Sequence, residues 1–145
     1  MKTILLLLCS LPLFAYAQWA NSSDTTFARI TKTDCDDRIF TKVEVPPVVK
    51  GGEAALAEHI LSYYKNEQQK LSGSAIYYFV LSKSGEITGI TRRQGGLSSP
   101  EIFVKALNAS RQLWEPAVQN DRKVCFEVKL NVTFTKEQAL VSINM

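Results

Sequence analysis

Apolar and polar residues alternate most regularly in RKVCFEVKLNVTF, residues 122–134. This alternation predicts a β-strand with one face on a core. The face expected to be buried carries Val124, Phe126, Val128, Leu130, Val132 and Phe134. Cys125 lies on the opposite face together with Glu127, Lys129, Asn131 and Thr133.

A β-hairpin is predicted upstream of this strand. Residues 75–82 are rich in aromatic and β-branched side chains, Ser84-Gly85 is a turn signal, and residues 86–93 continue as a weaker second strand. Both faces of the first strand are apolar, which is typical of a central strand that is covered on both sides.

Helical spacing of apolar residues predicts a first helix over about residues 53–69. The positions with this spacing are Leu56, Ile60, Tyr63 or Tyr64, and Leu71. A second helix is predicted to begin at Ser98, as a capping box with Glu101, or at Ser99, as an N-cap before Pro100. Its expected buried stripe contains Phe103, Ala106, Leu107, Ser110 and Trp114.

Two further strands are predicted near the N-terminus, at residues 26–32 and 39–45. Strands and helices in this order indicate an α+β domain in which two helices pack on one face of a mostly antiparallel sheet. We expect an exported leader and N-terminal β segment at 18–43, the main domain at 44–135 and a C-terminal tail at 136–145.

The first seventeen residues are typical of a signal peptide. Lys2 precedes an apolar run that is too short to span a bilayer, and Ala15-Tyr16-Ala17 matches a signal-peptidase site. Lipidation at Cys9 is disfavoured because Leu8 precedes it. We therefore expect a protein exported to the periplasm or secreted, with no membrane anchor or span in the mature chain.

Two cysteines, Cys35 and Cys125, remain after cleavage of this segment. An even count in an exported chain favours a disulfide, with two free thiols as the alternative. The bridge would tie the N-terminal β segment to the long strand, across the face of the sheet that points away from the helices.

No residue pattern in the chain indicates catalysis, a metal or a cofactor. The single histidine, His59, lies in a predicted helix without an acidic partner, and the acidic segment at 34–37 lacks the spacing of a calcium loop. No phosphate-binding pattern follows Gly51-Gly52. A formal net charge of +3 spread along 145 residues argues against nucleic acid. These features favour a binding protein over an enzyme.

Four segments in order resemble the C-terminal domain family of TonB, the periplasmic energy-coupling protein of Gram-negative bacteria. They are KGGEAALAEHI, GSAIYYFVLSKSGEITGI, LWEPA and VCFEVKLNVTF, and they span roughly residues 44–135. The residues that match the family's fold motifs are Gly51, Gly52, Glu53, Gly85, Trp114, Pro116 and Ala117. The family usually has Tyr-Pro after the first helix, where this chain has Tyr64-Lys65.

The resemblance implies a module that binds a protein or extended peptide by strand addition, in connection with TonB-dependent transmembrane transport. Expected partners are an outer-membrane transporter, another envelope protein or a second copy in a homodimer. One candidate edge is the weaker hairpin strand with Arg92 and Arg93. The other is the long strand, through Val124, Phe126, Val128, Lys129, Leu130 and Val132.

A cystatin-like secreted inhibitor or another non-catalytic binding domain is the alternative interpretation. A helix on an antiparallel sheet with a disulfide fits that class as well. The two interpretations differ at the Trp114-Glu115-Pro116 turn. An inhibitor would expose Trp114, whereas the TonB-like domain would bury it.

Overall fold

The computed structural model describes residues 34–35, 38–135 and 138–145. The expected signal peptide and the strand predicted at 26–32 lie outside this part of the chain.

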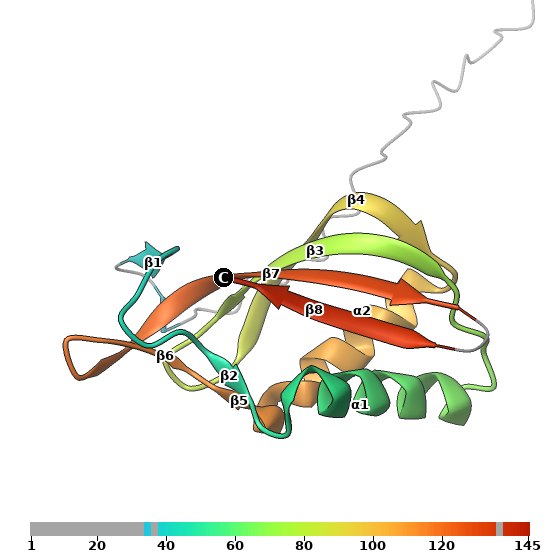
Figure 1. The fold of residues 1–145 in the computed structure, drawn as a ribbon, viewed down its shortest axis with the longest axis horizontal. Coiled ribbons are helices and arrows are strands. Elements are labelled where there is room, and N and C mark those ends of the chain that lie inside the picture. The colour runs from blue at the N-terminus through green and yellow to red at the C-terminus, as the bar shows by residue number, and fades with distance from the viewer. Residues whose placement is uncertain (1–33, 36–37, 136–137) are drawn as a thin grey trace, which may run out of the picture.

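The long strand β7 (Arg122–Phe134) is the centre of the main sheet (Figure 1). On one side it pairs with β3 (Gly73–Leu81), and β3 pairs in turn with β4 (Ile87–Leu97). Both of these pairings are antiparallel, so the predicted hairpin and long strand are confirmed.

Three short strands also pair with β7. They are β6 (Ala117–Gln119) and β8 (Ala139–Asn144), both antiparallel, and β1 (Ile39–Phe40), which is parallel. A separate ribbon consists of β2 (Val48–Val49) and β5 (Trp114–Glu115).

The helices α1 (Gly52–Asn66) and α2 (Pro100–Ala109) lie beneath the sheet, and the short 3-10 helix η1 (Ser110–Leu113) follows α2 (Figure 1). Ser99 is the N-cap of α2, but neither predicted side-chain cap forms. The Ser98 hydroxyl instead donates to the Lys70 carbonyl at 2.7 Å. The α+β class, with two helices and a mostly antiparallel sheet, is confirmed.

The core lies between the helices and the sheet. Phe103 of α2 stacks on Tyr77 of β3 with ring centroids 4.5 Å apart, and it meets Phe134 of β7 edge-on. The predicted apolar face of β7 is buried from Val124 to Phe134. Leu56, Ile60 and Tyr64 of the predicted first stripe are buried, whereas α1 ends at Asn66 and Leu71 is only partly buried beyond it. The predicted stripe of the second helix is buried from Phe103 to Trp114.

The prediction that β7 is a free edge is wrong. Lys129 pairs with Tyr78 of β3 and with Asn144 of β8. The proposed edge residues Val124, Phe126, Val128, Lys129, Leu130 and Val132 are therefore within the sheet. The reason is that the residues expected to be a C-terminal tail fold back as β8.

The predicted strand at 39–45 is also shorter than expected. Only Ile39 and Phe40 form β1, and Val45 makes an isolated bridge with Val118.

Candidate functional site

The glycine pair of the motif KGGE makes the turn into α1. Gly51 and Gly52 have φ of 81° and 77°, in the left-handed region that residues other than glycine rarely adopt. Glu53 then accepts a hydrogen bond on Oε1 from the Ile143 backbone N–H of β8 at 2.7 Å. The motif therefore fixes the start of the helix and joins it to the last strand.

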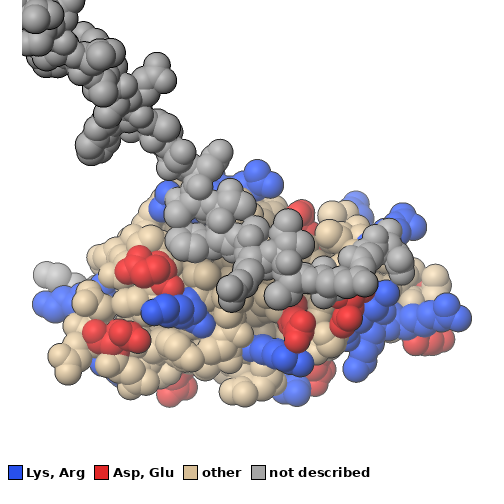
Figure 2. Space-filling model, turned by 180° about the vertical axis from the view of Figure 1, so that it is seen from behind, with Lys and Arg blue, Asp and Glu red and all other residues tan. Residues whose placement is uncertain are grey.

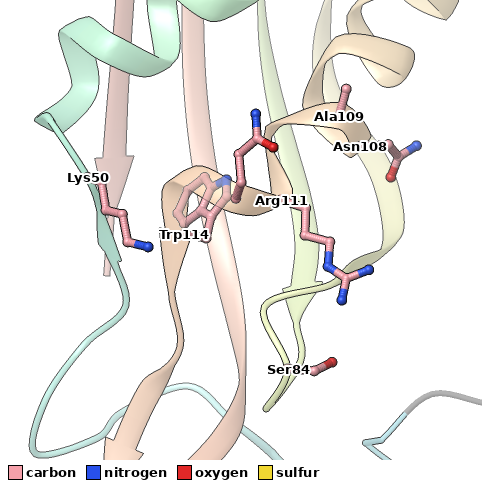
Figure 3. Close-up of a pocket in the computed structure, with 7 residues that line it drawn as sticks. Lys50, Ser84, Asn108, Ala109, Arg111 and Trp114 are labelled. Atoms are coloured by element: carbon pink, nitrogen blue, oxygen red, sulfur yellow. The ribbon is translucent and has the colours of Figure 1, made fainter.

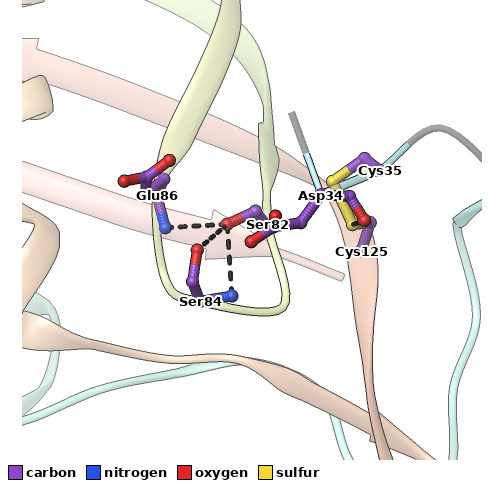
Figure 4. Close-up of a disulfide and its surroundings, with 6 residues drawn as sticks. All are labelled: Asp34, Cys35, Ser82, Ser84, Glu86 and Cys125. Atoms are coloured by element: carbon purple, nitrogen blue, oxygen red, sulfur yellow. Dashed lines mark hydrogen bonds between the residues drawn. A yellow bond between two sulfur atoms is a disulfide. The ribbon is translucent and has the colours of Figure 1, made fainter. Parts of the chain in front are cut away.

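Gly85 occupies the β3–β4 turn with φ of 84°. Beside it, the buried Ser82 hydroxyl oxygen accepts the backbone N–H groups of Ser84 and Glu86 at 3.3 and 3.0 Å (Figure 4). These bonds hold the turn closed, so Gly85 also has a structural role.

The corner LWEPA is mostly buried. Trp114 is only 4% exposed, and its ring meets the Phe79 ring edge-on with centroids 5.4 Å apart. The indole N–H donates to the Ser110 hydroxyl oxygen at 3.0 Å. Ala117 is buried and pairs with Val124 of β7, whereas Pro116 is partly buried. The corner is thus a packing element that leads into β6.

The predicted disulfide is confirmed. Cys35 and Cys125 are bonded, with their Cα atoms 5.7 Å apart (Figure 4). Because Cys125 also pairs with Ile39 of β1, the bridge and β1 attach the N-terminal region to the same point of β7.

His59 connects the two helices. Its Nε2 lies 3.0 Å from the Ala106 carbonyl oxygen of α2, and its ring is partly buried. Within the described residues, no group of three or more His, Cys, Asp or Glu side chains could hold a metal ion. No helix in that part of the chain is long and apolar enough to cross a membrane.

Among the outermost strands of the described sheet, β8 and β4 are the longest, and α1 restricts access to β8. Ile143 directs its backbone N–H away from β7 to Glu53 of α1. A hollow of about 350 Å³ between Ala139 and α1 separates the other end of β8 from the helix. A peptide strand added to β8 would have to fit between β8 and α1.

The outer side of β4 is more open. Among the described strands, β4 pairs only with β3, and its residues 91–96 are all exposed. Two irregularities interrupt its pairing, at Ile76/Tyr77 and at Tyr78/Val80. The predicted edge residues Arg92 and Arg93 both lie here, and the Arg93 guanidinium is 5.7 Å from the centre of the Tyr78 ring. Of the two edges predicted from the sequence, this one is unpaired on its outer side within the described residues.

Tyr77 and Arg92 are opposite each other at this edge. Burial raises the pKa of Tyr77, and the positive charge of Arg92 lowers it in part. The Tyr77 hydroxyl is buried and has no hydrogen-bond partner in the described structure.

A second concave feature lies beyond the β3–β4 turn. It is a cleft of about 520 Å³ lined by Lys50, Ser84, Asn108, Ala109, Arg111, Gln112 and Trp114 (Figure 3). The Arg111 guanidinium forms an ion pair with Glu86 at 2.9 Å. The sequence did not identify this cleft because its residues come from three separate segments, at Lys50, Ser84 and residues 108–114.

Charges of both signs are interspersed over the visible part of the face shown in Figure 2. The colouring shows no continuous basic stripe of the kind that tracks a nucleic-acid backbone.

Comparison with known proteins found no match to a family model, a curated protein or a solved structure. In the part of the chain that the structure describes, the fold is an α+β domain with an unpaired outer side of β4 and a cationic cleft.

Proposed function

We propose that this chain is an exported, non-catalytic protein-binding module that takes an extended peptide along the β4 edge. The observation that carries the proposal is that β4 pairs with β3 alone among the described strands, with residues 91–96 exposed. An outer strand of this kind offers backbone N–H and C=O groups to an incoming strand.

The four ordered motifs that resemble the TonB C-terminal domain support the same class of function. They favour a periplasmic location, an outer-membrane transporter or another envelope protein as partner, and a link to TonB-dependent transport. The paired cysteines fit an oxidising compartment outside the cytoplasm.

The inhibitor interpretation has less support. Trp114 is buried against Phe79 and its indole N–H is already bonded to Ser110. It could enter a protease only if this corner were unpacked. Glu115 is exposed but is paired with Val48 in the β2–β5 ribbon.

Site-specific photo-crosslinking in the full chain tests the proposal. A photoreactive residue replaces Gln94 on β4, with Ser142 on β8 and Glu101 on α2 as controls, because all three side chains are exposed. We expect one protein to crosslink to position 94 in cells that export the chain, and much less to the controls. No crosslinked partner, or equal capture at all three positions, would contradict the proposal.

A further inference from the structure

The cleft beyond the β3–β4 turn has the composition of an anion-binding site. Figure 3 shows Lys50 and Arg111 on opposite sides of Trp114, with Ser84 at the far end. Asn108 and Gln112 add side-chain amides, so every polar side chain in the lining can donate a hydrogen bond. The lining itself contains no acidic residue.

One carboxylate already lies against this lining. Glu86, at the end of the turn, places Oε1 2.9 Å from the Arg111 Nη1. The Arg111 and Glu86 side chains are 58% and 47% exposed, so this is a surface ion pair. Such exposed pairs contribute little to stability, so an external carboxylate can compete with Glu86 for the guanidinium.

Lys50 has no ion-pair partner among the described residues, although its backbone is held in place. Its N–H donates to the Leu113 carbonyl at 2.7 Å, directly before Trp114. Trp114 is fixed in turn by Ser110. The two cations therefore extend from anchored backbone on either side of a rigid indole, an arrangement that reduces the ordering cost of binding.

We propose that this cleft binds a carboxylate group of a small molecule or of a peptide. Arg111 supplies a planar pair of N–H donors that matches a carboxylate, Lys50 supplies a second positive charge, and Glu86 is an internal competitor. This site is separate from the outer side of β4, and its test does not depend on strand addition there.

Tryptophan fluorescence of the full exported chain tests this assignment, because Trp114 lines the cleft. Trp19→Phe removes the second tryptophan of the exported chain. Succinate and acetate are titrated at constant ionic strength, with inorganic phosphate as a separate arm. We expect saturable binding of succinate with a Kd of roughly 1 mM, the range of a weak surface site, and weaker binding of phosphate.

The variants are predicted to act in opposite directions. Arg111→Met and Lys50→Met should each weaken succinate binding about threefold or more, whereas Glu86→Gln should strengthen it about two- to fivefold. Lys105→Met is the matched control, since Lys105 is an exposed cation on α2 outside the cleft. It should leave the affinity unchanged.

Amide chemical shifts of Ser84 and Gln112 give a second readout in the same titrations. Saturable shifts of these amides that disappear in Arg111→Met support the site even if the indole emission is insensitive. Absence of saturation in both readouts overturns the proposal. An affinity that Arg111→Met does not change, weaker binding after Glu86→Gln, or a response to phosphate alone would also overturn it.

Discussion

The strands β7 and β4 are similar in length, yet the sheet uses them in opposite ways. β7 spans Arg122–Phe134, contains no glycine, is paired on both sides at Phe126 and residues 129–134, and carries the disulfide through Cys125. β4 spans Ile87–Leu97, is paired on one side, and contains three glycines and two interruptions of register. A regular strand with clean alternation became the interior of the sheet, and the irregular one became its open edge.

This contrast agrees with how proteins protect sheet edges. Bulges and charged side chains on an outer strand limit uncontrolled pairing with other chains. In β4 the two interruptions leave only short stretches with regular pairing, including residues 94–97 opposite Gly73–Ile76. Selective binding at β4 would therefore involve a short segment, whereas β7 is needed for the fold itself.

Removing the disulfide should have the largest effect. The bond closes a separation of 90 residues, so replacing Cys35 and Cys125 with alanine should lower the free energy of unfolding by about 4–5 kcal/mol on the chain-entropy estimate. Urea unfolding measures this loss, with reduced wild-type protein as the control. A loss below about 1 kcal/mol would mean that β1 attaches to β7 without help from the bridge.

Proline scanning compares interior and edge directly. Lys129→Pro should cost about 3 kcal/mol or more, because β7 is paired on both sides of Lys129 and proline has no N–H to donate. Arg93→Pro should cost about 1 kcal/mol or less, since Arg93 is the extra residue at an interruption and has no partner in β3.

Chemical denaturation of both proline variants, with Lys129→Ala and Arg93→Ala as controls for the side chains, checks this difference. Equal losses at the two positions would show that the β4 edge is as tightly held as the centre of the sheet.

Gly89 and Gly95 of β4 both have positive φ, but only at Gly95 would a Cβ also clash with a neighbouring strand. Gly95 has φ of 73°, and a Cβ there would clash with the Ser74 carbonyl oxygen of β3. Gly89 has φ of 63°, but a Cβ there would meet nothing within 4 Å. We expect Gly95→Ala to cost about 2–3 kcal/mol and Gly89→Ala about 1 kcal/mol. Melting temperatures that fall equally would argue against a close β3–β4 approach at Gly95.

The smallest effect is expected at the Tyr77–Arg92 contact. Burial raises the pKa of Tyr77 and the positive charge of Arg92 lowers it, so Arg92→Met should raise this pKa further. The stability linked to the neutral phenol is complete below the unfolded pKa of about 10 and is lost as pH rises through the folded pKa. Arg92→Met should therefore move that loss to higher pH.

Ultraviolet titration of tyrosinate formation measures the pKa, and Tyr77→Phe identifies its signal. Because the Tyr77 hydroxyl is buried without a partner in the described structure, Tyr77→Phe should be neutral or slightly stabilising. A large destabilisation would indicate that the hydroxyl makes a bond in solution.

Local patterns in the sequence predicted much of this fold. Alternation identified β7 and its buried face, helical spacing identified Leu56, Ile60 and Tyr64 as a core stripe, and Ser84-Gly85 located the hairpin turn. Each of these patterns depends only on neighbouring residues and on which of them are apolar. The spacing of apolar residues along the sequence contains that information.

Only the tertiary structure determined which strand lies at the edge of the sheet and which charged side chains line the same cleft. Residues 139–144 pair with β7 along residues 129–134, so the long strand, one of two candidate edges under the family resemblance, is not an edge there. Lys50, Ser84 and Arg111 are remote in sequence but line one cleft. Alternation specifies the faces of a strand, whereas edge pairing and clefts depend on contacts between distant segments, which no local pattern contains.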